Sequence, residues 1–205
     1  FDFNFLILTE AIYLNLKNFN YKYFSEEIPT HILYETQNYS KILNHEKGYR
    51  TIIYSKIPLS KKHQVIDDKT NIALEFETKM GAIIIYATII GTLFRQKPFA
   101  EIELENCVND CERIFKTNKK ILIIGDFNTS FNKDEKQFGI NSEITETLKK
   151  MIFNLELFNP TSNIKENIDH IIIPKLFENK LIETKLFIEK DILSDHVGIC
   201  ISLNP

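Results

Sequence analysis

The stretch "KKILIIGDFNTSFN", residues 119–132, runs from aliphatic residues through a glycine to Asp126 and Asn128. In a locally extended chain these two side chains point to the same side, so we expect them to converge on one small volume. The pair suits attack on a phosphate, because the carboxylate can hold a metal or take a proton from water while the neutral amide donates to a phosphate oxygen. Taken alone, the pair is equally consistent with an ordinary turn, where Asp and Asn are common.

Three further strand-like runs carry polar groups of the same kind at one end. Glu10 follows "FLILT", Asp169 and His170 lead into "IIIP", and Asp195 and His196 precede "VGICISL". A buried acid needs a partner, so we expect Asp169 to bond His196, whose near-neutral titration suits proton transfer, and His170 to point the other way. Each group alone could be a solvated strand end. Together they indicate hard oxygen ligands, which Mg²⁺ or Mn²⁺ prefers.

The segments that must position these groups alternate between β-branched runs and longer stretches of helical spacing. We predict strands at residues 4–8, 49–55, 71–78, 81–90, 120–125, 169–174, 181–189 and 196–203. Several of these runs are apolar without alternation, which is typical of strands covered on both faces, as when two sheets pack together with helices outside them. Helical spacing predicts helices at residues 97–117 and 142–155.

Length and composition narrow the class of protein. The 205 residues are 43% hydrophobic, enough for the core of one domain over residues 1–205. A net charge of −3 with well-mixed signs excludes a polybasic tail or a membrane-binding cluster, and no apolar run approaches a membrane span. The odd set Cys107, Cys111 and Cys200 favours reduced thiols and an intracellular setting, with the first two as core thiols.

Taken in order, these motifs resemble those of the endonuclease/exonuclease/phosphatase superfamily, metal-dependent phosphoesterases that include DNases and abasic-site endonucleases. The likeness rests on a Glu that closes an early strand, "GDFN" for the family's G-D-x-N, "IDHII" and a terminal "SDH". It covers nearly the whole chain. It implies a four-layer α/β (α+β) sandwich in which helices flank two packed, mostly antiparallel sheets, with the site at one end of the sheets.

The resemblance also assigns roles. The implied catalytic set is Asp126, Asn128, Asp169 and His196, and the implied metal ligands are Glu10 and Asp195. By this likeness Asp126 aligns or deprotonates the attacking water, Asn128 steadies the phosphate, and Asp169 orients the histidine. The cofactor implied is Mg²⁺ or Mn²⁺.

Two departures from the family pattern stand out. The family normally begins with a strand that carries an Asn ahead of the Glu, whereas this chain opens at Phe1 inside an apolar run, so we expect that first strand to be missing here. Many relatives also present a His or Tyr after the strand that precedes the long helix. This sequence offers only Tyr86 and Thr88 there, so protonation of the leaving group is less well provided for.

The leading hypothesis is a Mg²⁺-dependent phosphodiesterase that acts on nucleic acid by metal-assisted attack of water. The alternatives are a phosphomonoesterase or lipid phosphodiesterase on the same site, and a degenerate domain that only binds. A nuclease needs a groove for backbone phosphates. The basic residues in or beside predicted loops that could supply it are Lys17, Lys22, Arg50, Lys56, Lys61, Lys62, Arg95 and Lys97.

Overall fold

A computed structural model describes residues 3–27, 33–34, 37–38, 48–91, 99–132 and 142–205. Its larger sheet has six strands, of which only the neighbours β8 and β9 run parallel. In spatial order they are β10 (Leu157–Phe158), β11 (Asp169–Pro174), β9 (Ile121–Asp126), β8 (Gly81–Ile89), β7 (Ile72–Thr78) and β6 (Lys61–His63). Helix α1 (Phe99–Phe115) connects the parallel pair.

The remaining strands form smaller antiparallel sheets. They are β1 (Phe5–Ala11), β5 (Tyr49–Ser55) and β2 (Tyr21–Phe24) in one, β12 (Leu181–Ile188) and β13 (Gly198–Leu203) in the second, and β3 (Leu33–Tyr34) with β4 (Gln37–Asn38) in the third. Helix α2 (Ser142–Asn154) and a 3₁₀ helix, η2 (Lys175–Lys180), complete the described elements.

Alternation along β8 divides the core in two. Ile84 and Tyr86 pack with α1 and α2 on one face of the large sheet, while Ile83 and Ile85 face the smaller sheets. The second core takes side chains from β1, β2, β5, β7, β9, β11 and β13, so the sheets pack face to face. The predicted sandwich of packed sheets with helices is confirmed, and so is each predicted strand and helix to within a few residues.

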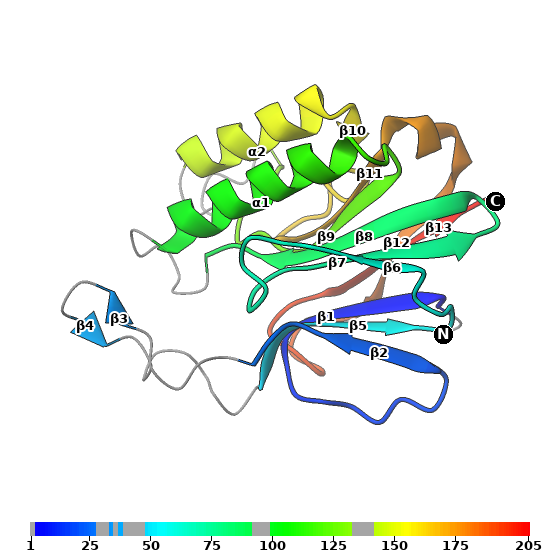
Figure 1. The fold of residues 1–205 in the computed structure, drawn as a ribbon, viewed down its shortest axis with the longest axis horizontal. Coiled ribbons are helices and arrows are strands. Elements are labelled where there is room, and N and C mark those ends of the chain that lie inside the picture. Colours follow the sequence, from blue (N-terminus) through cyan, green and yellow to red (C-terminus); the bar gives the residue numbers. More distant parts are fainter. Residues whose placement is uncertain (1–2, 28–32, 35–36, 39–47, 92–98, 133–141) are drawn as a thin grey trace.

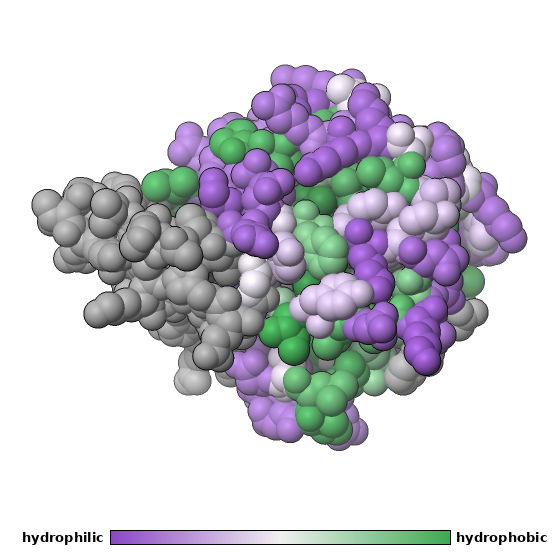
Figure 2. Space-filling model, turned by 60° about the horizontal axis from the view of Figure 1, so that its bottom comes forward, coloured by the Kyte–Doolittle hydropathy of each residue, from purple (hydrophilic) through white to green (hydrophobic). Residues whose placement is uncertain are grey.

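Both α-helices lie on the outer face of the six-stranded sheet, and the sheets β1–β5–β2 and β12–β13 lie on its inner side (Figure 1). On the far side of β5, the segment after β1 covers the ring of Tyr54. The Tyr54 hydroxyl accepts from the Leu14 N–H at 2.8 Å and donates to the Leu14 carbonyl at 3.0 Å. Figure 2 shows apolar and polar side chains interspersed on the face turned toward the reader. None of the helices in the described ranges is long and apolar enough to cross a membrane.

Cys107 and Cys111 lie buried between α1 and the large sheet, as expected for core thiols. Among the described residues, β1 pairs with β5 alone and β13 with β12 alone. The expectation that a further strand precedes Glu10 is not tested by these residues and stays a prediction.

Candidate active site

The site is built where β9 ends and β11 begins. Asp126 is the last residue of β9, and it lies directly opposite Asp169, the first residue of β11, in the antiparallel register. Asp126 is buried and Asp169 is half-buried. Like charges placed directly opposite each other destabilise a sheet, so this pair has no structural justification of its own.

Gly125 brings this end of β9 unusually close to β8. It pairs with Thr88 in the parallel register and has φ +153°. A Cβ at this position would lie 1.8 Å from the Thr88 carbonyl oxygen. Only glycine allows this approach, which sets the position of the Asp126 backbone that follows.

Asn128 holds the carboxylate of Asp126 from the loop. Its backbone N–H donates to Oδ1 of Asp126 at 2.8 Å, and its Nδ2 donates to Oδ2 at 3.0 Å and to the Ile90 carbonyl at 2.9 Å. Asn128 has φ +49°, a conformation that costs free energy outside glycine and that clusters at functional sites. The predicted convergence of Asp126 and Asn128 is therefore seen, with the amide bonded to the acid.

His196 reaches this pair of strands from the turn between β12 and β13. Its Nδ1 lies 2.8 Å from Oδ2 of Asp169, which directs Nε2 away from that carboxylate. The hydrogen bond with Asp169 raises the pKa of His196 to about 9, with burial acting in the opposite direction and the charges of Asp169, Asp126 and Asp195 adding to the rise. The ring is thus an imidazolium at neutral pH. The predicted Asp169–His196 bond is present.

Asp126 is the acid of the site whose ionised form is least favoured by its surroundings. Burial, and after it the charge of the Asp169 carboxylate, raise its pKa to about 8, while His196 and the Asn128 backbone N–H act to lower it. The charge of Glu10 also acts to raise it. A desolvated carboxylate flanked by two other acids is a group whose charge calls for a cation.

The residues predicted as metal ligands border this cluster. Glu10, in β1, has φ +46°, which is strained for a residue inside a strand, and its charge acts on Asp126. Asp195 is exposed in the turn, and its charge acts on the neighbouring His196. The assignment of these two as the metal ligands stays a prediction.

The atoms that do lie at ligand spacing belong to Asp126, Asp169 and His196. One ligand atom from each falls within 4.8 Å of the others. The two carboxylates of this group fit a hard divalent cation, because such an ion prefers oxygen ligands and would relieve the repulsion around Asp126, whereas the imidazolium of His196 has no lone pair to offer a metal. Mg²⁺ and Mn²⁺ suit such oxygen-rich sites better than Zn²⁺ does.

His170 points away from the cluster, as expected, and supports the loop that carries Asn128. It is buried, its Nε2 donates to the Thr129 carbonyl at 2.9 Å, and its Nδ1 lies 3.1 Å from the Thr161 hydroxyl. Burial lowers the pKa of His170 to about 4, so it is neutral in the fold. Sequence reasoning missed this support, because no spacing pattern links residues 129 and 161 to position 170.

The structure corrects one sequence-based candidate and supplies a partner for a neighbouring group. Arg50, a candidate for a phosphate groove, is buried and pairs with Glu103 at 3.1 Å, so it is not placed to bind substrate. Thr88, to which sequence reasoning assigned no catalytic role, is also buried, and its hydroxyl donates to Oδ1 of Asn71 at 2.7 Å. Arg95 and Lys97 lie outside the described residues.

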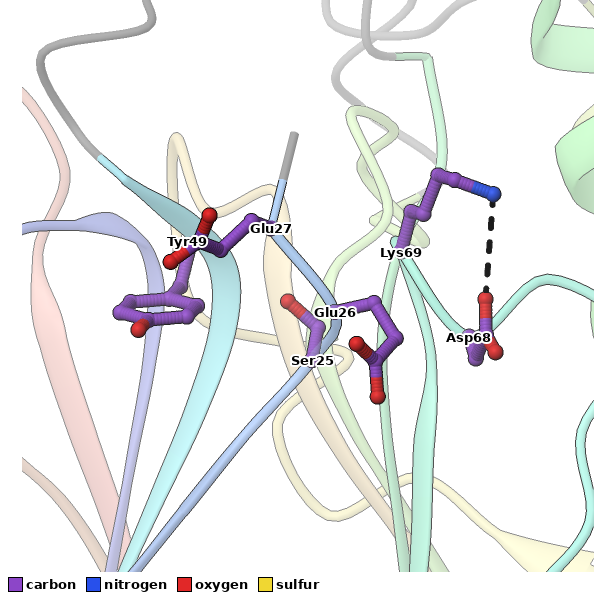
Figure 3. Close-up of a pocket in the computed structure, with 6 residues that line it drawn as sticks. All are labelled: Ser25, Glu26, Glu27, Tyr49, Asp68 and Lys69. Atoms are coloured by element: carbon purple, nitrogen blue, oxygen red, sulfur yellow. Dashed lines mark ion pairs between the residues drawn. The ribbon is translucent and has the colours of Figure 1, made fainter. Parts of the chain in front are cut away.

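A separate pocket of about 550 Å³ opens beyond the ends of β2 and β5. Its lining residues are Ser25, Glu26, Glu27, Tyr49, Asp68 and Lys69 (Figure 3). Lys69 pairs with Asp68 at 3.9 Å, shown there as a dashed line. Three carboxylates make this pocket unfavourable for a phosphate, and none of the predicted site residues lines it.

No protein-family model and no curated protein sequence matches the chain at a significant level. Solved structures do match. An AP endonuclease from Archaeoglobus fulgidus is 13% identical, with a TM-score of 0.62 over 78% of this chain and 77% of that chain. The chain has the fold of the endonuclease/exonuclease/phosphatase superfamily.

Two further structures show the same fold. A 3′-5′ exonuclease (NExo) from Neisseria meningitidis is 13% identical, with a TM-score of 0.61 over 76% of this chain and 75% of that chain. The endonuclease domain of TRAS1, a telomere-specific non-LTR retrotransposon, is 12% identical, with a TM-score of 0.58 over 76% and 74%. At these identities the superfamily likeness rests on the fold and on the motif residues that it gathers at one end of the sheets.

Proposed function

We propose that the chain hydrolyses phosphodiester bonds of nucleic acid and that the reaction depends on Mg²⁺ or Mn²⁺. The observation that best supports this is the meeting of Asp126, Asp169 and His196 from three separate strand ends. Two opposed carboxylates beside an imidazolium lower the stability of the fold, because burying charges costs free energy. The same groups are well suited to a reaction at a phosphate.

The roles follow from the contacts. Asp126, held at both oxygens by Asn128, is the group that aligns the attacking water and accepts its proton. The imidazolium of His196, oriented by Asp169, donates to a phosphate oxygen and balances the charge that develops there. A bound divalent cation would polarise the phosphate and restore the ionised form of Asp126, with Glu10 and Asp195 helping to hold it.

The substrate class is supported by the names of the structures that share the fold. They are a 3′-5′ exonuclease, an AP endonuclease and a retrotransposon endonuclease domain, and a second structure of NExo, named as a 3′ phosphatase, is bound to a product DNA hairpin. A nucleic acid phosphodiester is the substrate common to most of these names. We extend it to this chain as a proposal.

The experiment is a hydrolysis assay with and without metal. Bis-p-nitrophenyl phosphate is the sharpest first substrate, because its leaving group departs without a proton and Thr88 is engaged elsewhere. A plasmid and a single-stranded oligonucleotide test nucleic acid, and p-nitrophenyl phosphate tests monoester hydrolysis. We expect turnover of the diesters in Mg²⁺ or Mn²⁺ and its loss in EDTA.

The controls separate the competing functions. Faster hydrolysis of the monoester than of every diester would favour a phosphatase on the same site. The proposal would be wrong if protein that is folded by circular dichroism showed no metal-dependent turnover of any of these substrates. The chain would then be a domain that only binds.

A further inference from the structure

The turn that delivers His196 also presents two large apolar side chains to solvent. Ile192 is 65% exposed and Leu193 is 77% exposed, at the tip of the connection between β12 and β13. The turn has a defined shape, because the Asp191 N–H donates to the Ser194 carbonyl at 2.7 Å and the His196 N–H donates to the Ser194 hydroxyl at 3.2 Å.

Single exposed apolar residues are normal on protein surfaces, but consecutive branched aliphatics at the tip of a turn are a different case. Here they stand only a few residues before the group that faces the phosphate. The same hydrogen bonds that place the His196 backbone also fix the tip, so Ile192 and Leu193 keep a set position relative to the site.

Resting on the nucleic-acid function proposed above, we propose that Ile192 and Leu193 form a substrate contact that packs against an unpaired base beside the scissile phosphate. Apolar side chains of this size are the ones that proteins insert against unstacked bases. Every base offers an apolar face, so the contact favours single-stranded or locally unpaired substrate without reading its sequence. A fully stacked duplex hides those faces.

An exposed aromatic ring follows the strand that carries Glu10. Tyr13, which follows Glu10 closely in the chain, is 50% exposed, and the Lys22 ammonium lies 2.6 Å from its hydroxyl and 4.8 Å from its ring centroid. An exposed ring beside a cation is the combination that binds a base and the adjoining backbone phosphate of a single strand. The segment after β1 therefore offers a second side chain that suits unpaired nucleotides.

The charges of the turn argue against a lipid surface as its partner. Glu189, Lys190 and Asp191, directly before the tip, are all exposed. Immersing the tip in a bilayer would draw two acids toward the hydrocarbon, which is costly and is disfavoured further by anionic headgroups. A base contacts the two tip side chains alone and leaves these charges in water.

The experiment compares the double variant Ile192→Ser/Leu193→Ser with Ile182→Ser. Ile182 is 68% exposed on the same hairpin, at the opposite end of β12. It is therefore about as exposed as Ile192 and Leu193 but lies away from the turn. Fluorescence anisotropy in Ca²⁺ measures binding of a fluorescein-labelled oligonucleotide as a single strand and as a duplex of the same sequence. Turnover of both forms and of bis-p-nitrophenyl phosphate is measured in Mg²⁺.

We expect the double variant to bind the single strand about tenfold more weakly, with a similar rise in KM, since the unpaired base loses its apolar contact. The rise should be larger for the single strand than for the duplex or for bis-p-nitrophenyl phosphate. Ile182→Ser should bind and turn over every substrate as the wild type does.

Three results would overturn the inference. The first is equal single-strand binding by the double variant and the wild type. The second is an equal loss on bis-p-nitrophenyl phosphate, which would assign the turn to the integrity of the site. The third is a loss of binding to phosphatidylcholine/phosphatidylserine vesicles with oligonucleotide binding intact, which would identify a lipid contact. The binding measurement does not depend on catalysis. An inactive wild type would therefore count against the proposed function, while the effect of the turn on binding could still be measured.

Discussion

The two halves of the candidate site are held by the fold in opposite ways. Asp126 and Asn128 sit at the buried end of β9, fixed by the Gly125 approach to β8 and by hydrogen bonds to the loop. His196 comes from an exposed turn, and the hydrogen bond between its ring and Asp169 links that turn to the large sheet. The buried half has its geometry set by the core, whereas the exposed half is oriented chiefly by this contact.

This contrast separates two kinds of sensitivity. Changes in the buried half should act through the chemistry or through the stability of the whole domain. Changes in the turn should leave the free energy of unfolding nearly unaltered and act on how His196 and the substrate are oriented. Substitutions in each half test that division.

Asp126→Asn should remove most activity while leaving the fold intact. Loss of the group that takes the proton from water should lower kcat on bis-p-nitrophenyl phosphate about 10³-fold. The free energy of unfolding should stay level or rise, because the amide replaces a carboxyl group whose ionisation is opposed in the fold by burial and by Asp169. Urea unfolding and turnover in Mg²⁺ measure the two quantities, with Asp68→Asn, an exposed acid away from the site, as the control. A variant that cannot fold would show that Asp126 is structural.

Gly125→Ala should destabilise the domain through the clash with the Thr88 carbonyl. An atom placed 1.8 Å from a backbone oxygen forces β8 and β9 apart, which we expect to lower the free energy of unfolding by about 3 kcal/mol. Gly48→Ala is the matched control, since Gly48 has φ +68° with nothing within 4 Å of an added Cβ. It should cost only about 1 kcal/mol, from backbone conformation alone. Equal effects in urea denaturation would show that the close approach is unimportant.

His170 should make the domain acid-sensitive. Its pKa is about 4 in the fold and near 6.5 when unfolded, so the unfolded state binds the extra proton as the pH falls through this window. The contribution of neutral His170 to the free energy of unfolding is fully present above pH ~6.5 and is lost as the pH falls toward ~4, a change of roughly 3 kcal/mol. His170→Gln should flatten this part of the pH dependence of unfolding, measured by urea titrations at pH 7.5 and 4.5. Parallel pH dependences in the two proteins would contradict this.

The sequence predicted more of this buried half than of its supports. Apolar runs with Asp126, Asp169 or Glu10 at one end indicated both the strands and the candidate site, because buried strands expose their polar ends where they enter or leave the core. The bonds of His170 to Thr129 and Thr161 left no periodic signal, since they join loops that only tertiary packing brings together. The same holds for the turn at Ile192, whose exposure depends on the hairpin and not on local spacing.

Burial of Arg50 shows the other limit of sequence reasoning. Its position at the start of a strand, next to a predicted loop, suggested an exposed cation, yet packing against α1 gives it Glu103 as a partner. A charged side chain next to a strand can be solvated or buried with a partner, and the difference lies in which helix covers it. The acidic partner is in a distant part of the chain, so no local pattern could identify the pair.

Asp169→Asn should have the smallest effect on rate and give the clearest information about the exposed half. The amide keeps the shape near His196 but removes the charge that holds the imidazolium, so kcat/KM should fall about 10- to 100-fold. The raised pKa of His196 depends first on this bond, so its loss should move the alkaline limit of activity, set by deprotonation near pH 9, toward lower pH.

The double variant Asp169→Asn/His196→Ala decides whether Asp169 acts through the histidine. If it does, the double variant should be no slower than His196→Ala alone, and the unfolding midpoints in urea should differ little. Additive losses would mean that Asp169 also acts elsewhere, most directly on Asp126, which lies opposite it in the sheet. An unshifted pH profile in Asp169→Asn would mean that its charge does not hold the proton on His196. The exposed half would then depend on the turn itself for its orientation, through the backbone bonds around Ser194.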